Sequence, residues 1–144
     1  MYQDQGVPFL GKTLKERAII NQWTEVESQT FNPVVSVMVV ESYMSRWEKR
    51  PLNEAIIATG LAKLKPVFDV YEGQLSKHKY LAGDEYSLAD LLHAPNLNYL
   101  MTYLKTEAYG NYPHVLAWAQ KIISRPAVQK VVELKAKWLK QQTQ

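Results

Sequence analysis

Apolar side chains recur every three or four positions along most of this chain, which is the spacing of one buried face on an α-helix. The signals for helix starts agree with this spacing. Thr13 and Glu16 match a capping box, in which each side chain satisfies a free backbone amide of the first turn. Asn53 is a suitable cap for a second helix. The pattern therefore predicts an all-α fold, and its most regular stripe is Ile57, Leu61, Leu64, Phe68, Tyr71 and Leu75.

The segment 34–40 is the one stretch whose pattern leaves two structures open. It is a run of β-branched residues, interrupted by Ser36 and Met38, and it follows Pro33 directly. Such a run favours a buried strand on propensity alone. The alternative is a helix that continues from residue 13 to about residue 47, bends at Pro33 and is buried on several sides.

Three further helices are expected in the second half of the chain. Ser87 and Asp90 match a second capping box, and the helix that starts there is rich enough in apolar residues, Leu91 and Leu92 among them, to be central. A proline opens each of the other two, at the first helical position that proline tolerates. Together the signals predict a bundle of five or more helices, at 13–47, 54–76, 88–104, 113–124 and 126–140, with bends at Pro33, Pro66 and Pro95.

Composition narrows the class of protein further. The 144 residues are enough for one domain, and 47% of them are apolar. The absence of cysteine excludes a disulfide, a thiolate metal site and a cysteine nucleophile. No apolar run approaches the roughly 20 residues that a membrane-spanning helix needs, and the first residues do not read as a secretory signal. We therefore expect a cytoplasmic protein without a membrane partner.

The net charge of +3 comes largely from the last helix, where four lysines cluster. Such a cluster could contact nucleic-acid phosphates, but basic residues also favour the end of any helix because they oppose its negative pole. No arginine stripe or aromatic platform accompanies the lysines, so we expect no nucleic-acid partner. The four residues are Lys130, Lys135, Lys137 and Lys140.

The segment YLAGDEYSLAD, from Tyr80 to Asp90, and six further blocks of sequence resemble the C-terminal helical domain of plant phi-class glutathione transferases. This segment is the most specific of the seven, and the others follow in family order with family spacing. In that family the stretch that contains residues 34–40 is helical, so the resemblance favours the bent helix over the strand. The blocks are 14–18, 22–27, 31–33, 69–72, 80–90, 95–97 and 125–127.

The resemblance implies two domains with different roles. Intact members combine a thioredoxin-like domain, which binds glutathione and supplies a catalytic serine, with the helical domain. Residues 1–12 resemble the linker between them, and residues 13–144 resemble the helical domain alone. We therefore expect no catalytic residue and no bound cofactor in this chain. Glutathione would be a co-substrate only if the other domain is supplied, and whether the chain acts as an enzyme stays open.

Positions that line the family's hydrophobic pocket correspond here to Phe31, Val35, Met38 and Tyr99. The first three are four and three residues apart, so they share one face of a helix, and Tyr99 would add a hydroxyl to an apolar wall. The competing interpretation is that an aromatic and methionine stripe at helical spacing is ordinary core.

Other candidate chemistry is weaker. Asp90 and His93 lie three residues apart on one helix face and could act as an acid and a base, but a capping box already gives Asp90 a structural task. His78 and His114 lack a second ligand at metal-binding spacing, so no metal site is expected.

Three functions are compatible with these observations. The chain can be the helical half of a glutathione transferase, providing the pocket for the hydrophobic co-substrate. It can be a non-catalytic carrier of apolar or aromatic small molecules. It can also be an interaction module that pairs with a thioredoxin-like domain or with a second copy of itself.

Overall fold

The computed structural model describes residues 9–104 and 109–142, and these form an all-α fold. Two of the five helices switch from α-helical to π-helical geometry along their length, which confirms the prediction of bent helices. The first consists of α1 (Leu14–Val26), the π-helical turn η2 (Glu27–Phe31) and α2 (Asn32–Trp47). The others are α3 (Glu54–Leu75), α4 (Leu88–Tyr99) with the π-helical turn η3 (Leu100–Leu104), α5 (Pro113–Ile123) and α6 (Pro126–Gln142).

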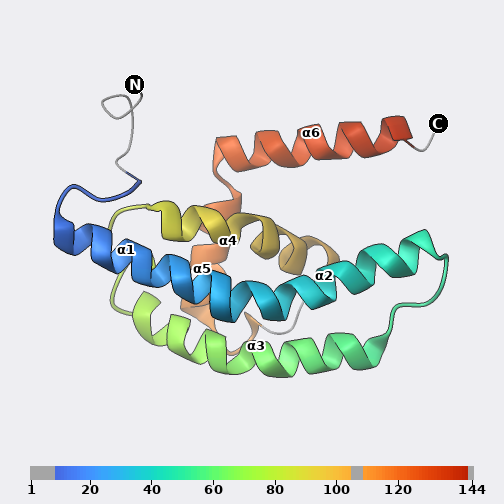
Figure 1. Cartoon of the computed structure of the whole chain (residues 1–144), viewed down its shortest axis with the longest axis horizontal. Coiled ribbons are helices and arrows are strands. Elements are labelled where there is room, and N and C mark those ends of the chain that lie inside the picture. Colours follow the sequence, from blue (N-terminus) through green and yellow to red (C-terminus); the bar gives the residue numbers. More distant parts are fainter. Residues whose placement is uncertain (1–8, 105–108, 143–144) are drawn as a thin grey trace.

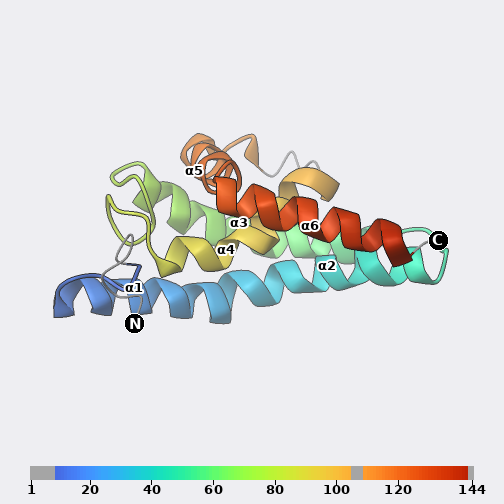
Figure 2. The ribbon, with the colours of Figure 1, turned by 90° about the horizontal axis from the view of Figure 1, so that it is seen from above.

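The rod formed by α1 and α2 crosses the whole molecule, and α3 runs back beside it (Figure 1). Helix α4 packs against α1, α2 and α5, and α5 also packs against α3. Helix α6 then runs along the bundle toward the far end of α2 (Figure 2). There Lys135 Nζ donates a hydrogen bond to the hydroxyl of Tyr43, at 2.6 Å.

The helix starts that the sequence predicts are confirmed in the first half of the chain. Thr13 Oγ1 accepts from the backbone amide of Glu16 at 3.2 Å, and a Glu16 carboxylate oxygen accepts from the amide of Thr13 at 3.2 Å. Asn53 Oδ1 accepts from the amide of Ala55 at 3.1 Å at the start of α3. These bonds satisfy amides that have no partner within the helix.

Residues 34–40 are helical, so the strand that propensity favours is wrong. The reason is visible in the buried stripe, which passes through Trp23, Glu27, Phe31 and Val35 at steps of four. Because an α-helix has 3.6 residues per turn, each such step turns the stripe by about 40°. The wider turn of η2 absorbs this rotation. Val35 and Met38 thereby stay on the face that α3 and α4 cover, whereas Val37 and Val40 are more than half exposed, so the expectation of burial on several sides is wrong for these two residues.

An aromatic cluster around Tyr71 fills the centre of the bundle. Its ring meets Trp23 edge to face at 5.6 Å, Trp118 at 6.0 Å and His93 at 5.4 Å between centroids. Its hydroxyl hydrogen-bonds to His93 Nε2 at 2.8 Å. The cluster joins α1, α3, α4 and α5, so the stripe predicted on α3 is indeed its core face.

Helix α4 is less enclosed than its composition predicts. Leu91 and Leu92 are 39% and 38% exposed, whereas Ala89, Leu97 and Leu100 are completely buried. The other helices cover one side of α4 and leave part of it open. The prediction that Leu91 and Leu92 lie in a central helix is therefore wrong for these two side chains.

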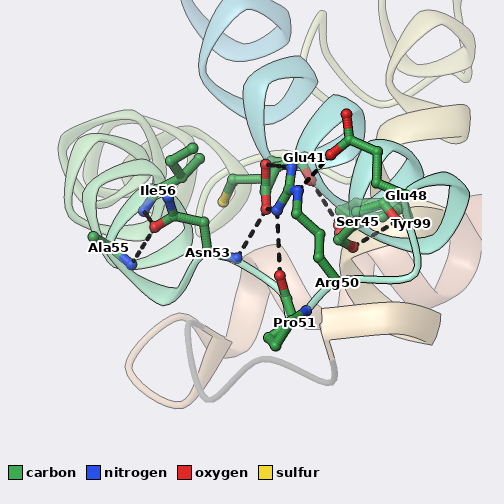
Figure 3. Close-up of polar contacts among 11 residues, drawn as sticks. Glu41, Ser45, Glu48, Arg50, Pro51, Asn53, Ala55, Ile56 and Tyr99 are labelled. Atoms are coloured by element: carbon green, nitrogen blue, oxygen red, sulfur yellow. Dashed lines mark hydrogen bonds and ion pairs between the residues drawn. The ribbon is translucent and has the colours of Figure 1, made fainter.

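The connection between α2 and α3 is held by the buried carboxylate of Glu41 (Figure 3). Arg50 donates to both of its oxygens, at 2.5 and 2.9 Å, and the backbone amide of Asn53 donates to one of them at 2.8 Å. Arg50 also contacts Glu48 at 2.6 Å. The hydrogen bonds from Arg50 and Asn53 lower the pKa of Glu41 from 4.5 to about 2.

We predict that Glu41 makes the fold acid-sensitive. Because its pKa is depressed in the folded state, its contribution to stability is fully present above pH 4.5 and is lost as the pH falls toward 2. Glu41→Gln should lower stability at pH 7 and flatten the pH dependence over that interval, measured by urea unfolding at several pH values. Glu48→Gln is the matched control and should change both much less. Equal effects of the two substitutions would contradict this role of Glu41.

Candidate functional site

The four side chains predicted to line a pocket all lie in the core. Phe31, Val35 and Met38 are completely buried and Tyr99 is 6% exposed. The ring of Phe31 lies 4.7 Å from that of His93. The structure thus encloses all four; Tyr99 on α4 reaches the backbone of Met38 on α2, and the Met38 side chain lies against Gly60 on α3.

Tyr99 connects these buried side chains to the surface. Its hydroxyl donates to the carbonyl oxygen of Met38 at 2.9 Å and also hydrogen-bonds to Ser42. Burial raises the pKa of Tyr99, which favours the protonated hydroxyl. Its ring stacks at 5.7 Å on Tyr103, which is 44% exposed and lies beneath the guanidinium of Arg46. The Tyr99–Tyr103 pair therefore links the buried backbone of Met38 to a ring that solvent reaches.

A separate apolar hollow of about 300 Å³ lies between α4 and α6, and we call it the α4–α6 hollow. Lys135 is the only charged residue in its lining. Large apolar side chains continue outward from it along α6, where Val131, Leu134 and Trp138 are more than half exposed. The lining is Leu91, Ala94, Pro95 and Asn98 from α4, and Ala127, Val128, Val131, Val132 and Lys135 from α6.

Asp90 serves as a structural anchor at the start of α4, where it forms a capping box with Ser87. Its carboxylate is completely buried and accepts from the backbone amides of Leu81 and Ser87 at 3.1 and 3.0 Å. It also accepts from Ser87 Oγ at 3.1 Å and from the indole nitrogen of Trp118 at 3.0 Å. With so many donors, the carboxylate has little capacity left to act as a base.

His93 is likewise used inside the core. Its Nδ1–H donates to the carbonyl oxygen of Ala89 at 2.7 Å, and Nε2 accepts from the Tyr71 hydroxyl at 2.8 Å. Burial lowers its pKa to about 4, so the ring is neutral at physiological pH. The geometry does not support an acid–base pair of Asp90 and His93.

The other two histidines lie on the surface beside carboxylates. His114 Nδ1 is 2.6 Å from Glu72, and His78 Nδ1 is 3.9 Å from Asp84. Within residues 9–104 and 109–142, no three potential ligands come close enough to hold a metal ion.

Glu27 is an unusual group that the sequence analysis passed over. It lies in η2 with only 7% of its surface exposed, and its carboxylate makes no hydrogen bond to any described residue. Burial raises its pKa. The hydroxyl of Thr24, one turn earlier, is buried without a partner among the described residues. A charged residue in the core stripe between Trp23 and Phe31 was the available signal.

Comparison with known proteins identifies the fold. Residues 31–126 match the family model of the glutathione S-transferase C-terminal domain. The chain belongs to this family. The match includes all four predicted pocket residues and the capping box of Ser87 and Asp90, and the homologues are plant phi-class glutathione transferases.

Individual relatives extend the similarity to almost the whole chain. A glutathione S-transferase of Hyoscyamus muticus is 42% identical over 93% of this chain, and glutathione S-transferase F11 of Arabidopsis thaliana is 38% identical over 94%. The chain spans 63% and 64% of these relatives. About a third of the length of each of these relatives therefore has no counterpart in this chain.

Solved structures of glutathione transferases share the fold described above. The crystal structure of glutathione transferase F7 from Populus trichocarpa matches 92% of this chain with a TM-score of 0.83 at 42% identity. Glutathione S-transferase I from maize, solved in complex with an atrazine glutathione conjugate, matches 92% with a TM-score of 0.76 at 34% identity. The chain spans 62% and 63% of these two structures. In the part described here, no helix of this transferase domain is long and apolar enough to cross a membrane.

We predict that Ser87 and Asp90 stabilise this transferase domain to different extents. Ser87→Ala should cost about 1 kcal/mol, the usual value for losing a helix cap, and should leave ligand binding intact. Asp90→Ala should cost at least about 3 kcal/mol, because it leaves several buried donors without an acceptor. Chemical unfolding measures both. A large change in ligand binding with unchanged stability would show that these residues belong to a site.

We predict that Glu27→Gln stabilises the domain at pH 7, because burial raises the pKa of the Glu27 carboxyl and so disfavours its charged form. A raised pKa in the folded state means that the wild type loses stability as the pH rises above 4.5, the ordinary value. The variant should not show this loss in thermal unfolding between pH 4 and 7. Glu25→Gln, on the exposed side of α1, is the control. A destabilised Glu27→Gln variant would contradict the prediction.

Proposed function

We propose that this chain is the helical half of a phi-class glutathione transferase and that it provides the pocket for a hydrophobic co-substrate. The observation that carries the proposal is the α4–α6 hollow, an apolar surface on a chain that spans less than two thirds of its relatives. Exposed apolar patches of this kind are typical of surfaces that meet another domain or a ligand. In the proposal this hollow receives the co-substrate, and a thioredoxin-like domain beside it binds glutathione.

The chemistry of the surface supports a co-substrate that is apolar or aromatic. The hollow is lined almost entirely by aliphatic side chains, and the Tyr99–Tyr103 pair adds two stacked rings, of which Tyr103 is 44% exposed. The maize relative was solved with an atrazine glutathione conjugate. By analogy, this chain would receive the electrophile, and glutathione would be held by the other domain.

Phe31, Val35, Met38 and Tyr99 have a defined part in this proposal. Because Phe31, Val35 and Met38 are completely enclosed, they would support the pocket wall from the core side without touching the electrophile. Tyr99 would act on the electrophile indirectly, by holding the stacked ring of Tyr103 in place. Substitution of Phe31 should therefore change the fit of the electrophile and not the affinity for glutathione. A cytoplasmic location stays a prediction.

Two alternatives each have an observation in their favour. The α4–α6 hollow is open without a second domain, as a non-catalytic carrier of apolar molecules would require. A dimerising module would use the outer face of α2, where Val37 and Val40 are more than half exposed and Val37 lines a hollow shared with α3. Binding of an environment-sensitive dye by the chain alone, and its mass across a range of concentrations, distinguish the two.

We predict that the chain alone does not conjugate glutathione to 1-chloro-2,4-dinitrobenzene, and that activity appears when it is fused to the remaining third of the Hyoscyamus muticus relative. In that fusion, Phe31→Ala should raise the KM for the electrophile several-fold and leave the KM for glutathione unchanged. Steady-state kinetics measures both constants.

The matched control is Ile122→Ala, which removes an equally buried side chain from α5, away from the predicted pocket. It should lower stability without changing the KM for the electrophile. Robust conjugation by the chain alone, or identical kinetics of the two variants, would overturn the proposal.

A further inference from the structure

Residues 9–12 connect the starts of two helices, and we call them the strap. The backbone amide of Leu88, the first residue of α4, donates to the carbonyl oxygen of Phe9 at 2.9 Å. This amide has no partner within α4, because the first amides of any helix lack one. At the other end of the strap, the amide of Lys12 donates to the carboxylate of Glu16 at 2.6 Å, in the first turn of α1.

Gly11 gives the strap its bend. Its φ of +80° lies in the left-handed region, which favours glycine. A Cβ atom on Gly11 would also lie 2.8 Å from the Cβ of Glu16, so no larger residue fits without a shift. The carbonyl oxygen of Gly11 accepts from Arg17 Nε at 3.3 Å. The path of the strap between α4 and α1 is therefore defined by specific contacts.

The ring of Phe9 is part of a stack that reaches the opposite side of the bundle. It meets the ring of Tyr86 edge to face, with 5.6 Å between centroids. The guanidinium carbon of Arg125 lies 3.7 Å from the centre of the same ring, a cation–π geometry. Tyr86 is only 6% exposed, so its ring is enclosed between these neighbours. We call these three residues the Phe9–Tyr86–Arg125 stack.

Arg125 lies at the corner where α5 turns into α6, and only two residues separate these helices. Its backbone amide donates to the carbonyl oxygen of Ile122 in α5 at 3.3 Å. Its carbonyl oxygen accepts from the amide of Gln129 in the first turn of α6 at 3.0 Å. One residue therefore joins the stack, the end of α5 and the start of α6.

Helix α6 packs loosely against the rest of the bundle. The α4–α6 hollow separates it from α4 over the stretch that contains Val128 and Val132. Three large apolar side chains of α6 are more than half exposed. Farther along, Lys135 donates a hydrogen bond to Tyr43 of α2. The direction in which α6 leaves the corner thus sets the width of the α4–α6 hollow.

We propose that the strap regulates the α4–α6 hollow through the Phe9–Tyr86–Arg125 stack. With the strap in place, Phe9 holds Tyr86, Tyr86 holds Arg125, and the corner keeps α6 in one position relative to α4. A pull on the chain before residue 9, as an attached domain would exert when it moves, releases Phe9 and loosens α6. As a means of regulating the co-substrate pocket, this coupling rests on the function proposed above; as a property of the fold, it rests on the contacts alone.

The test follows hydrogen exchange of single backbone amides in the full chain by NMR. Phe9→Ala removes the ring and keeps the carbonyl group that accepts from Leu88. Exchange should become about tenfold faster at Leu88 and about threefold faster at Gln129 and Val132, because the loss of one aromatic contact favours local opening. Val132 reports directly on the wall of the α4–α6 hollow. The core amide of Leu97 should be unchanged.

Two further variants separate the coupling from a general effect. Leu10→Ala changes the next residue of the strap, which is 55% exposed, and should leave all four amides unchanged. Arg125→Met keeps an unbranched side chain but removes the cation from the stack. In the Arg125→Met background, Phe9→Ala should still speed exchange at Leu88 and should no longer affect the two amides of α6.

Unchanged exchange at Gln129 and Val132 in Phe9→Ala would overturn the proposal, because the strap would then hold only the start of α4. Equal acceleration at Leu97 would also overturn it, because the strap would then act on the whole domain. The test uses neither glutathione nor an electrophile. It is therefore read separately from the kinetics of the fusion, and the proposed function can fail while the coupling stands.

Discussion

The buried carboxylate of Asp90 is the interaction on which the arrangement of this domain depends. A completely buried charge is tolerated only when donors surround it, and here the donors come from three segments: the loop at Leu81, the cap at Ser87 and the ring of Trp118 on α5. Each contact fixes one segment relative to α4. The block of sequence that identifies the family is therefore also the point where loop, α4 and α5 are joined.

Both surface hollows follow from this joint. The direction in which α4 leaves its cap places Leu91 and Pro95 opposite α6, which creates the α4–α6 hollow. The bond to Trp118 sets the bottom of a second hollow, where the end of α3 and the loop after it meet α5, and the held loop places Tyr80 under Lys121. Asp90 contacts neither hollow, so it acts on function only by holding the elements that line them.

The helices and their starts could be predicted from the sequence because they depend on local chemistry. Thr13, Asn53 and Ser87 satisfy amides within a few residues of themselves. Segment 34–40 could not be assigned by propensity, because its helix depends on η2 and on burial by α3 and α4. The resemblance to known transferases supplied what propensity lacked.

The candidate sites were predictable only in part. Phe31, Val35, Met38 and Tyr99 are all buried, but their enclosure depends on contacts with other helices that spacing does not contain. The α4–α6 hollow pairs Leu91 with Val131, and the hollow between the end of α3 and α5 pairs Lys77 with Lys121. Pairs about 40 residues apart leave no local pattern, so the sequence analysis missed both surfaces.

Hydrogen exchange provides the most direct test of the role of Asp90. The account predicts that the backbone amides of Leu81 and Ser87 and the indole N–H of Trp118 exchange as slowly as the core amide of Leu97, through one common opening of the domain. Fast exchange at the first three positions, with Leu97 still protected, would contradict it. That result would mean that the loop, α4 and α5 are held together by something other than this carboxylate.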